Sequence, residues 1–124
     1  MTEDYVSFET AKLLKEKRFP IPSNNFRDWV FCMYDKNGDI QWGCYHPDYY
    51  CRVTHQMAMK WLREAHKLFI EIRAGVDGSN IWYDFDIMSL EERAIKPDDT
   101  IYELNTYEEA AEAAIKYCLE NLIK

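Results

Sequence analysis

The stretch from Thr54 to Phe69, THQMAMKWLREAHKLF, constrains the fold more than any other part of the chain. It contains neither Gly nor Pro, and its apolar residues recur at the spacing of a helix. On a helical projection they spread over an arc of roughly 200°, which is about twice the width that a helix lying on a surface requires. These residues are Met57, Ala58, Met59, Trp61, Leu62, Ala65, Leu68 and Phe69. We therefore expect a central helix that neighbouring elements cover on more than one side.

Length and composition predict a single packed domain over residues 1–124. The apolar fraction of 48% allows a core that needs no metal or disulfide. The formal net charge of −7 disfavours duplex nucleic acid and anionic membranes as partners, because both attract basic proteins. No apolar run is long enough to cross a bilayer, and the segment MTEDYVSF lacks the basic start of a secretory signal. We therefore expect a cytoplasmic protein with reduced cysteines, and the absence of a cofactor motif predicts no cofactor.

Local signals predict seven elements in the order α-β-β-α-β-β-α. Ser7 suits a helix N-cap, and Thr106-Tyr-Glu-Glu109 is a capping box that opens a C-terminal helix. Strand candidates precede the central helix at 29–34 and 40–45, and others follow it at 68–73 and 81–87, with a short edge strand at 100–104. The simplest arrangement is an α+β fold, a mostly antiparallel sheet of four or five strands packed against helices.

Both strand pairs carry hairpin signals. Asn37-Gly38 favours a type I′ turn, which would place Met33 opposite Trp42. In the second hairpin the strand at 81–87 alternates between apolar and polar residues. One face is expected to be buried, with Ile81, Tyr83, Phe85 and Ile87, and the other to be solvated, with Trp82, Asp84 and Asp86.

Two surfaces are candidates for binding a partner. An aromatic surface gathers near the first hairpin, from Trp29, Trp42, Tyr45, Tyr49 and Tyr50. Such residues suit a core, a protein interface or a stacking platform for a sugar or a single strand. A basic stripe of Lys60, Arg63 and Lys67 follows one face of the central helix and could meet an acidic partner. A solvated helix face is the alternative for this stripe.

A small-ligand pocket is predicted as an alternative site, beside His55, His66 and Asp84. The two histidines share a helix edge but lie about 16 Å apart along the axis, so they cannot act on one small atom. Cys44, His46, Cys51 and His55 could together bind zinc, but their spacing is a poor match to known zinc signatures, and we predict no metal site.

Three segments of the sequence resemble a known group of proteins. They are YVSFETAKLLKEKRF, THQMAMKWLRE and TYEEAAEAAIKYCLENLI. On these segments the chain resembles short uncharacterised proteins of gut Bacteroidales and of their phages and mobile elements. The resemblance implies no activity and no catalytic residue. It implies a small cytoplasmic accessory protein, in a setting where inhibitors, adaptors and regulators are common.

These observations favour a non-catalytic interaction or regulatory module that binds another protein through the aromatic surface or the basic stripe. The first alternative is a small-ligand-binding protein or enzyme that uses the pocket predicted above. A second alternative, suggested by the acidic charge, is a nucleic-acid mimic or regulator. A cleft where polar side chains converge would favour an enzyme, whereas an exposed apolar patch would favour an interaction module.

Overall fold

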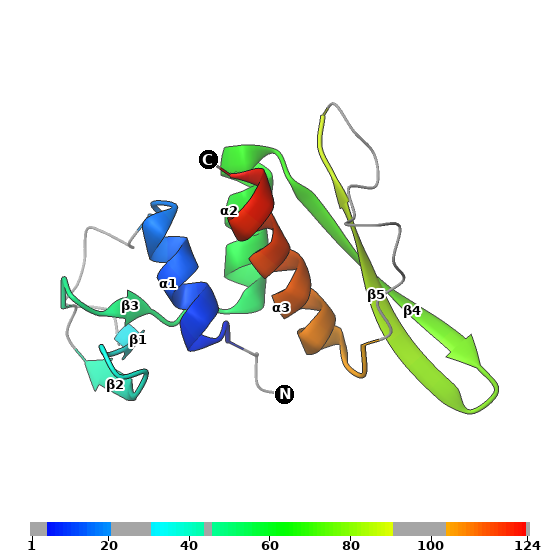
Figure 1. Cartoon of the computed structure of the whole chain (residues 1–124), viewed down its shortest axis with the longest axis horizontal. Helices are drawn as coiled ribbons and strands as arrows, with labels where there is room; N and C mark the ends of the chain where they lie inside the picture. Colours follow the sequence, from blue (N-terminus) through cyan, green and yellow to red (C-terminus); the bar gives the residue numbers. More distant parts are fainter. Residues whose placement is uncertain (1–4, 21–30, 44–45, 91–103, 124) are drawn as a thin grey trace.

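A computed structural model describes residues 5–20, 31–43, 46–90 and 104–123 of the chain. Within these ranges it contains three helices and two small antiparallel sheets, which confirms the α+β class (Figure 1). The helices are α1 (Phe8–Glu16), α2 (His55–His66) and α3 (Tyr107–Tyr117), which continues into the π-helical turn η2 (Cys118–Leu122). The strands are β1 (Phe31–Tyr34), β2 (Ile40–Gly43), β3 (Tyr50–Cys51), β4 (Phe69–Asp77) and β5 (Asn80–Met88).

The predicted element order and the predicted single sheet are both wrong. The structure adds strand β3, and its strands form one sheet in the order β2-β1-β3 and a separate sheet of β4 and β5. With two residues, β3 is too short to leave a pattern in the sequence. The helices lie between the two sheets, so the hairpins cannot join each other (Figure 1). Of the edge strand expected at 100–104, only Leu104 is described, and it forms an isolated bridge with Tyr83.

The three predicted helix starts are confirmed by their capping hydrogen bonds. Ser7 accepts from the backbone N–H of Thr10, and Thr54 accepts from that of Met57. Thr106 accepts from the backbone N–H of Glu109, as a capping box requires. Each cap satisfies an amide that the first helical turn would otherwise leave without a partner.

Helix α2 is shorter and less enclosed than predicted. It ends at His66, because Lys67 adopts a left-handed backbone conformation with φ of 55°, and β4 begins at Phe69. Met57 and Ala65 are exposed, so the buried stripe is narrower than the predicted arc. The central element is instead α3, which packs against α1, α2, β4 and β5.

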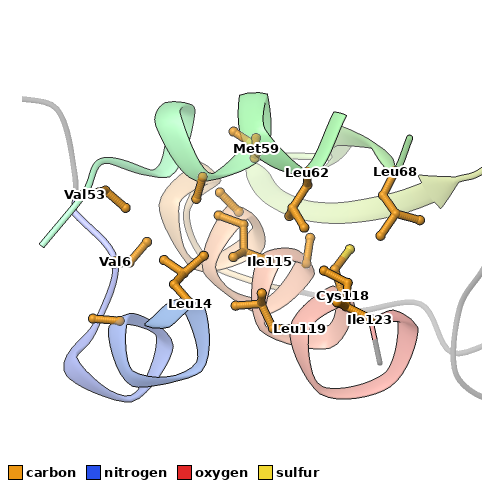
Figure 2. Close-up of a cluster of buried hydrophobic side chains, with 14 of the residues drawn as sticks. Val6, Leu14, Val53, Met59, Leu62, Leu68, Ile115, Cys118, Leu119 and Ile123 are labelled. Atoms are coloured by element: carbon orange, nitrogen blue, oxygen red, sulfur yellow. The ribbon is translucent and has the colours of Figure 1, made fainter. Parts of the chain in front are cut away.

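The core lies where the helices meet. Figure 2 shows Leu14 of α1, Met59 and Leu62 of α2 and Ile115 of α3 in this cluster. The chain before α1 and after η2 adds further buried side chains, Val6 and Ile123 among them. Along α3, the buried residues before Ile115 are three alanines, Ala110, Ala111 and Ala114. Their small side chains let neighbouring helices approach closely, and full burial of each larger apolar side chain stabilises the fold by about 1.5–3 kcal/mol.

The first hairpin forms, but its turn and register differ from the prediction. Cys32, not Met33, lies opposite Trp42. The loop contains three residues, 36–38, because the N–H of Asp35 bonds to the carbonyl of Asp39 and only Gly38 has a positive φ, of 87°. A three-residue loop closed by a left-handed glycine is a type I turn with a bulge, which shifts the register by one relative to a type I′ turn.

The second hairpin, β4 and β5, is the longer one; we call it the arm. Its nine residue pairs run from Phe69–Met88 to Asp77–Asn80. Near the helices, Phe85 and Ile87 are buried as predicted, whereas Ile81 on the same face is exposed, contrary to the prediction. This face continues past the part of the arm that the helices cover, and the arm projects away from them (Figure 1).

The remote half of the arm is held by a contact of its own. A Cβ built on Gly75 would lie 2.0 Å from Cζ2 of Trp82, so the indole occupies the space beside this glycine. Gly75 and Trp82 are directly paired across the strands. An aromatic ring that covers a glycine in this way compensates for the weak strand preference of glycine.

Candidate functional site

The predicted aromatic surface is only partly exposed. Trp42 has 65% of its surface accessible, beside an exposed Ile40 on strand β2. Tyr49 instead stacks on His46, with ring centroids 4.3 Å apart, and Tyr50 packs against Phe8. Trp29 and Tyr45 lie outside the described residues. Tyr50 therefore belongs to the packing of α1 on the first sheet.

The basic stripe lies on the solvent side of α2. Lys60, Arg63 and Lys67 are all exposed, and Lys67 Nζ donates to the backbone carbonyl of Glu64 at 3.1 Å. Among the described residues, none of the three cations has a carboxylate within ion-pair distance. The stripe stays a prediction for a partner surface.

The residues of the predicted ligand pocket have separate surroundings. His55 and His66 are the first and last residues of α2, and His66 lies edge-on to Trp61 at 4.7 Å. Asp84 was expected to be solvated but is only 2% exposed, and its carboxylate is 3.3 Å from the guanidinium of Arg73. An open cavity of about 520 Å³ is lined in part by His55, but neither His66 nor Asp84 lines it.

Glu112 on α3 accepts four hydrogen bonds from described residues. Its Oε1 accepts from His55 Nε2 at 2.9 Å and from the backbone N–H of Ser7 at 3.1 Å. Its Oε2 accepts from the hydroxyls of Ser7, at 2.9 Å, and Thr10. Since Ser7 caps α1 and His55 opens α2, one carboxylate joins the N-terminal ends of two helices to the third. We call these four residues the Glu112 junction.

The surroundings of the Glu112 junction favour an ionised carboxylate. Burial alone would raise the pKa of Glu112, but the hydrogen bonds from His55, Thr10 and Ser7 together hold the pKa below its ordinary value. The positive ends of two helix dipoles act in the same direction. The hydroxyls bond to the carboxylate, whereas a nucleophilic triad requires a hydroxyl bonded to the imidazole. The geometry therefore suits the positioning of helices.

The residues weighed for zinc do not form a cluster where the structure describes them. His46 stacks on Tyr49, and His55 is bonded to Glu112. Cys51 is half-buried on β3, while Cys44 lies outside the described residues. No group of three or more potential ligands from His, Cys, Asp and Glu occurs within the described part of the chain.

A cavity lies at the C-terminal end of α1, where no sequence pattern predicted one. It measures about 290 Å³, and its lining is mainly apolar. The lining residues are Ala11, Leu14, Lys15, Arg18, Phe19, Tyr49 and Cys51. These residues come from two segments more than 25 positions apart, which meet because α1 packs against β3. No local pattern could have revealed this juxtaposition.

The remote end of the arm is a second feature that the sequence did not single out. Val76 and Ile81 face each other directly across the strands and are 71% and 59% exposed. Both lie on the same face of the arm as Ile72 and Phe85. Closer to the helices, Ile72 is half-buried and Phe85 is buried. The alternation of apolar and polar residues was visible in the sequence. The position along the arm at which the helices stop covering the apolar face was not.

Comparison with known proteins gives no relatives: no protein-family model matches the chain, and neither a curated protein nor a solved structure is significantly similar to it. The helices within the described residues are all too short or too polar to cross a membrane.

Proposed function

We propose that the protein is a non-catalytic interaction module that binds a partner protein at the remote end of the arm. The observation that carries the proposal is the exposed Val76–Ile81 pair, on an apolar face that the protein's own helices leave uncovered. Isolated exposed apolar residues are common, whereas two that lie side by side at the end of a projecting hairpin form a contiguous apolar surface that a partner can cover. The resemblance to short uncharacterised proteins of Bacteroidales and of their phages and mobile elements supports this proposal only through context, since inhibitors, adaptors and regulators are common products in that setting.

The chemistry of the arm also indicates the kind of partner. Strand β4 pairs with β5 on one side, and no described residue pairs with its other edge. An extended segment of a partner could add to that edge and place apolar side chains against Val76 and Ile81. Asp77 is exposed beside this pair, on a protein with a net charge of −7. The partner segment is therefore apolar with flanking basic residues.

The test measures how strongly partner proteins are enriched on the tagged protein and compares this enrichment between variants. Val76→Lys combined with Ile81→Lys places two charges in the proposed interface. Leu90→Lys is the matched control, because it alters an exposed apolar residue outside the Val76–Ile81 pair. Circular dichroism confirms that each variant is folded.

The proposal predicts that a specific partner is retained by the wild type and by Leu90→Lys and is lost from the double variant. Ile40→Lys combined with Trp42→Lys tests the aromatic surface in the same way. Loss of the partner only in this second double variant would place the interface on β2. Equal recovery by all variants would contradict binding at either hairpin.

A further inference from the structure

The cavity at the C-terminal end of α1 has the chemical character of a small-molecule site. Its inner lining includes the buried side chains of Ala11 and Leu14, and the ring of Phe19 adds further apolar surface. A concave apolar site with a few polar groups at fixed positions is typical of ligand pockets. The volume of about 290 Å³ corresponds to about ten non-hydrogen atoms, if each occupies roughly the 30 Å³ of a liquid water.

Among the described residues, the two charged side chains that line this cavity, Lys15 and Arg18, are both cations. Lys15 Nζ donates to the backbone carbonyls of Pro47 at 2.7 Å and Tyr49 at 3.1 Å, and it lies 4.9 Å from the centre of the Tyr50 ring. These contacts fix the position of the ammonium group at the cavity. A cation that is already positioned loses little freedom when an anion binds.

Neither cation of the cavity is neutralised by the described part of the protein. Lys15 and Arg18 form no ion pair there, although the chain has 22 acidic and 15 basic residues. By contrast, Arg73 and Lys116 are each paired with carboxylates. Two unpaired cations beside an apolar cavity are complementary to an anion with an apolar body.

The backbone at Arg18 provides an independent observation. Its φ is 66°, a left-handed conformation that favours glycine. The N–H of Arg18 bonds to the carbonyl of Lys15, and that of Phe19 bonds to the carbonyl of Leu14, which is the Schellman pattern. An arginine at this position is less favourable for the helix end than glycine, so its side chain can be removed without loss of the fold.

We propose that this cavity binds a small amphiphilic carboxylate, with its head group between Lys15 and Arg18 and its apolar body against Leu14 and Phe19. Cys51, which also lines the cavity, does not compete as an anion, because burial raises the pKa of its thiol. This site is separate from the partner surface on the arm, and the two proposals can fail independently.

The probe is octanoate, which has about ten non-hydrogen atoms, and octan-1-ol is its uncharged counterpart of equal chain length. Titration of the isotope-labelled full chain, followed by amide chemical shifts, gives both the affinity and the location. Octanoate is expected to bind saturably, with a Kd of about 1 mM or tighter, and to shift amides near Leu14, Phe19 and Cys51. Octan-1-ol is expected to bind at least about tenfold more weakly.

Two glycine variants separate binding from folding. Arg18→Gly removes one cation and relieves a left-handed arginine, so the chain stays folded while octanoate binds about tenfold more weakly. Lys67→Gly is the control, because it also replaces a left-handed cationic residue at a helix end with glycine. Lys67 does not line the cavity, so this variant is expected to leave octanoate binding unchanged. The proposal is overturned by an absence of saturable octanoate binding, by shifts confined to other regions, or by equal affinities in wild type and Arg18→Gly.

Discussion

At the Glu112 junction, three helices meet around a carboxylate whose oxygens are both hydrogen-bonded, whereas at the remote end of the arm two apolar side chains face solvent. The Glu112 junction draws its contacts from α1, α2 and α3. The remote end draws its contacts from within the arm, chiefly from Trp82 against Gly75. A change at the Glu112 junction thus affects three elements, and a change at the remote end affects one.

This contrast separates the part of the molecule that maintains the fold from the part that is free to bind. Regions with few buried apolar contacts open at lower free energies than the core does. Partner binding at such a region can order it without disturbing the helices.

The largest difference is expected between two substitutions on one face of β5. Phe85→Ala removes a buried ring beneath the helices and should lower the free energy of unfolding by about 3–5 kcal/mol. Ile81→Ala, four residues away on the same face, should change it by less than about 0.5 kcal/mol, because its side chain is largely exposed. Urea denaturation measures both, and similar losses would contradict the division of the arm.

Glu112→Gln should lower the free energy of unfolding by about 2 kcal/mol at neutral pH, because it replaces an ionised acceptor of four hydrogen bonds with an amide. The folded-state pKa of Glu112 lies below its ordinary value of 4.5. The contribution of this carboxylate is therefore fully present above pH 4.5 and is lost as the pH falls toward the folded-state pKa.

The same prediction can be checked through the pH dependence of stability. As far as the Glu112 carboxylate is concerned, the difference in free energy of unfolding between wild type and Glu112→Gln should stay constant from pH 7 to pH 4.5. Below pH 4.5 this difference should shrink. Denaturation curves measured at several pH values test this. A difference that grows on acidification would show that the sign of the pKa shift is wrong.

Gly75→Ala should affect the arm without affecting the helices. The added methyl group would overlap the Trp82 indole, so the ring must move. The expected loss is about 1 kcal/mol, at the low end for overpacking because the remote half of the arm can adjust. Tryptophan near-ultraviolet circular dichroism should change while the helical far-ultraviolet signal is retained. Unaltered spectra and stability would show that the ring does not lie on Gly75.

Lys67→Gly is expected to have a small effect on stability, in the direction opposite to that of the destabilising substitutions above. Lys67 links α2 to β4 in a left-handed conformation that costs about 1 kcal/mol for a residue other than glycine. The greater freedom of glycine in the unfolded chain offsets part of this gain. Thermal unfolding should therefore show a slight stabilisation, of about 0.5 kcal/mol. A destabilised variant would indicate that the Lys67 side chain has a structural role.

The fold was predictable where local chemistry decides it. Ser7, Thr54 and Thr106 identified the three helix starts, because a cap is formed by residues only three apart. The register of the first hairpin was not predictable from Asn37-Gly38, since that pair also suits a longer loop in which only the glycine is left-handed. The division into two sheets depends on helices packing between them, which is a tertiary property.

The candidate sites were less predictable than the elements. The aromatic surface retained Trp42 as an exposed residue, but Tyr50 proved to be packed against α1. His55 stood out in the sequence, yet its partner Glu112 lies 57 residues away and could not be paired with it by spacing. The cavity beside Arg18 and the Val76–Ile81 pair both depend on where covering elements end.

Amide hydrogen exchange along the arm tests the central claim most directly. If the arm divides into a structural half and a free half, amides near Ile72 and Phe85 should open at free energies close to that of global unfolding. Amides near Val76 and Ile81 should open at free energies lower by at least about 2 kcal/mol. Uniform protection from one end of the arm to the other would contradict the claim and would make the whole arm part of the cooperative fold.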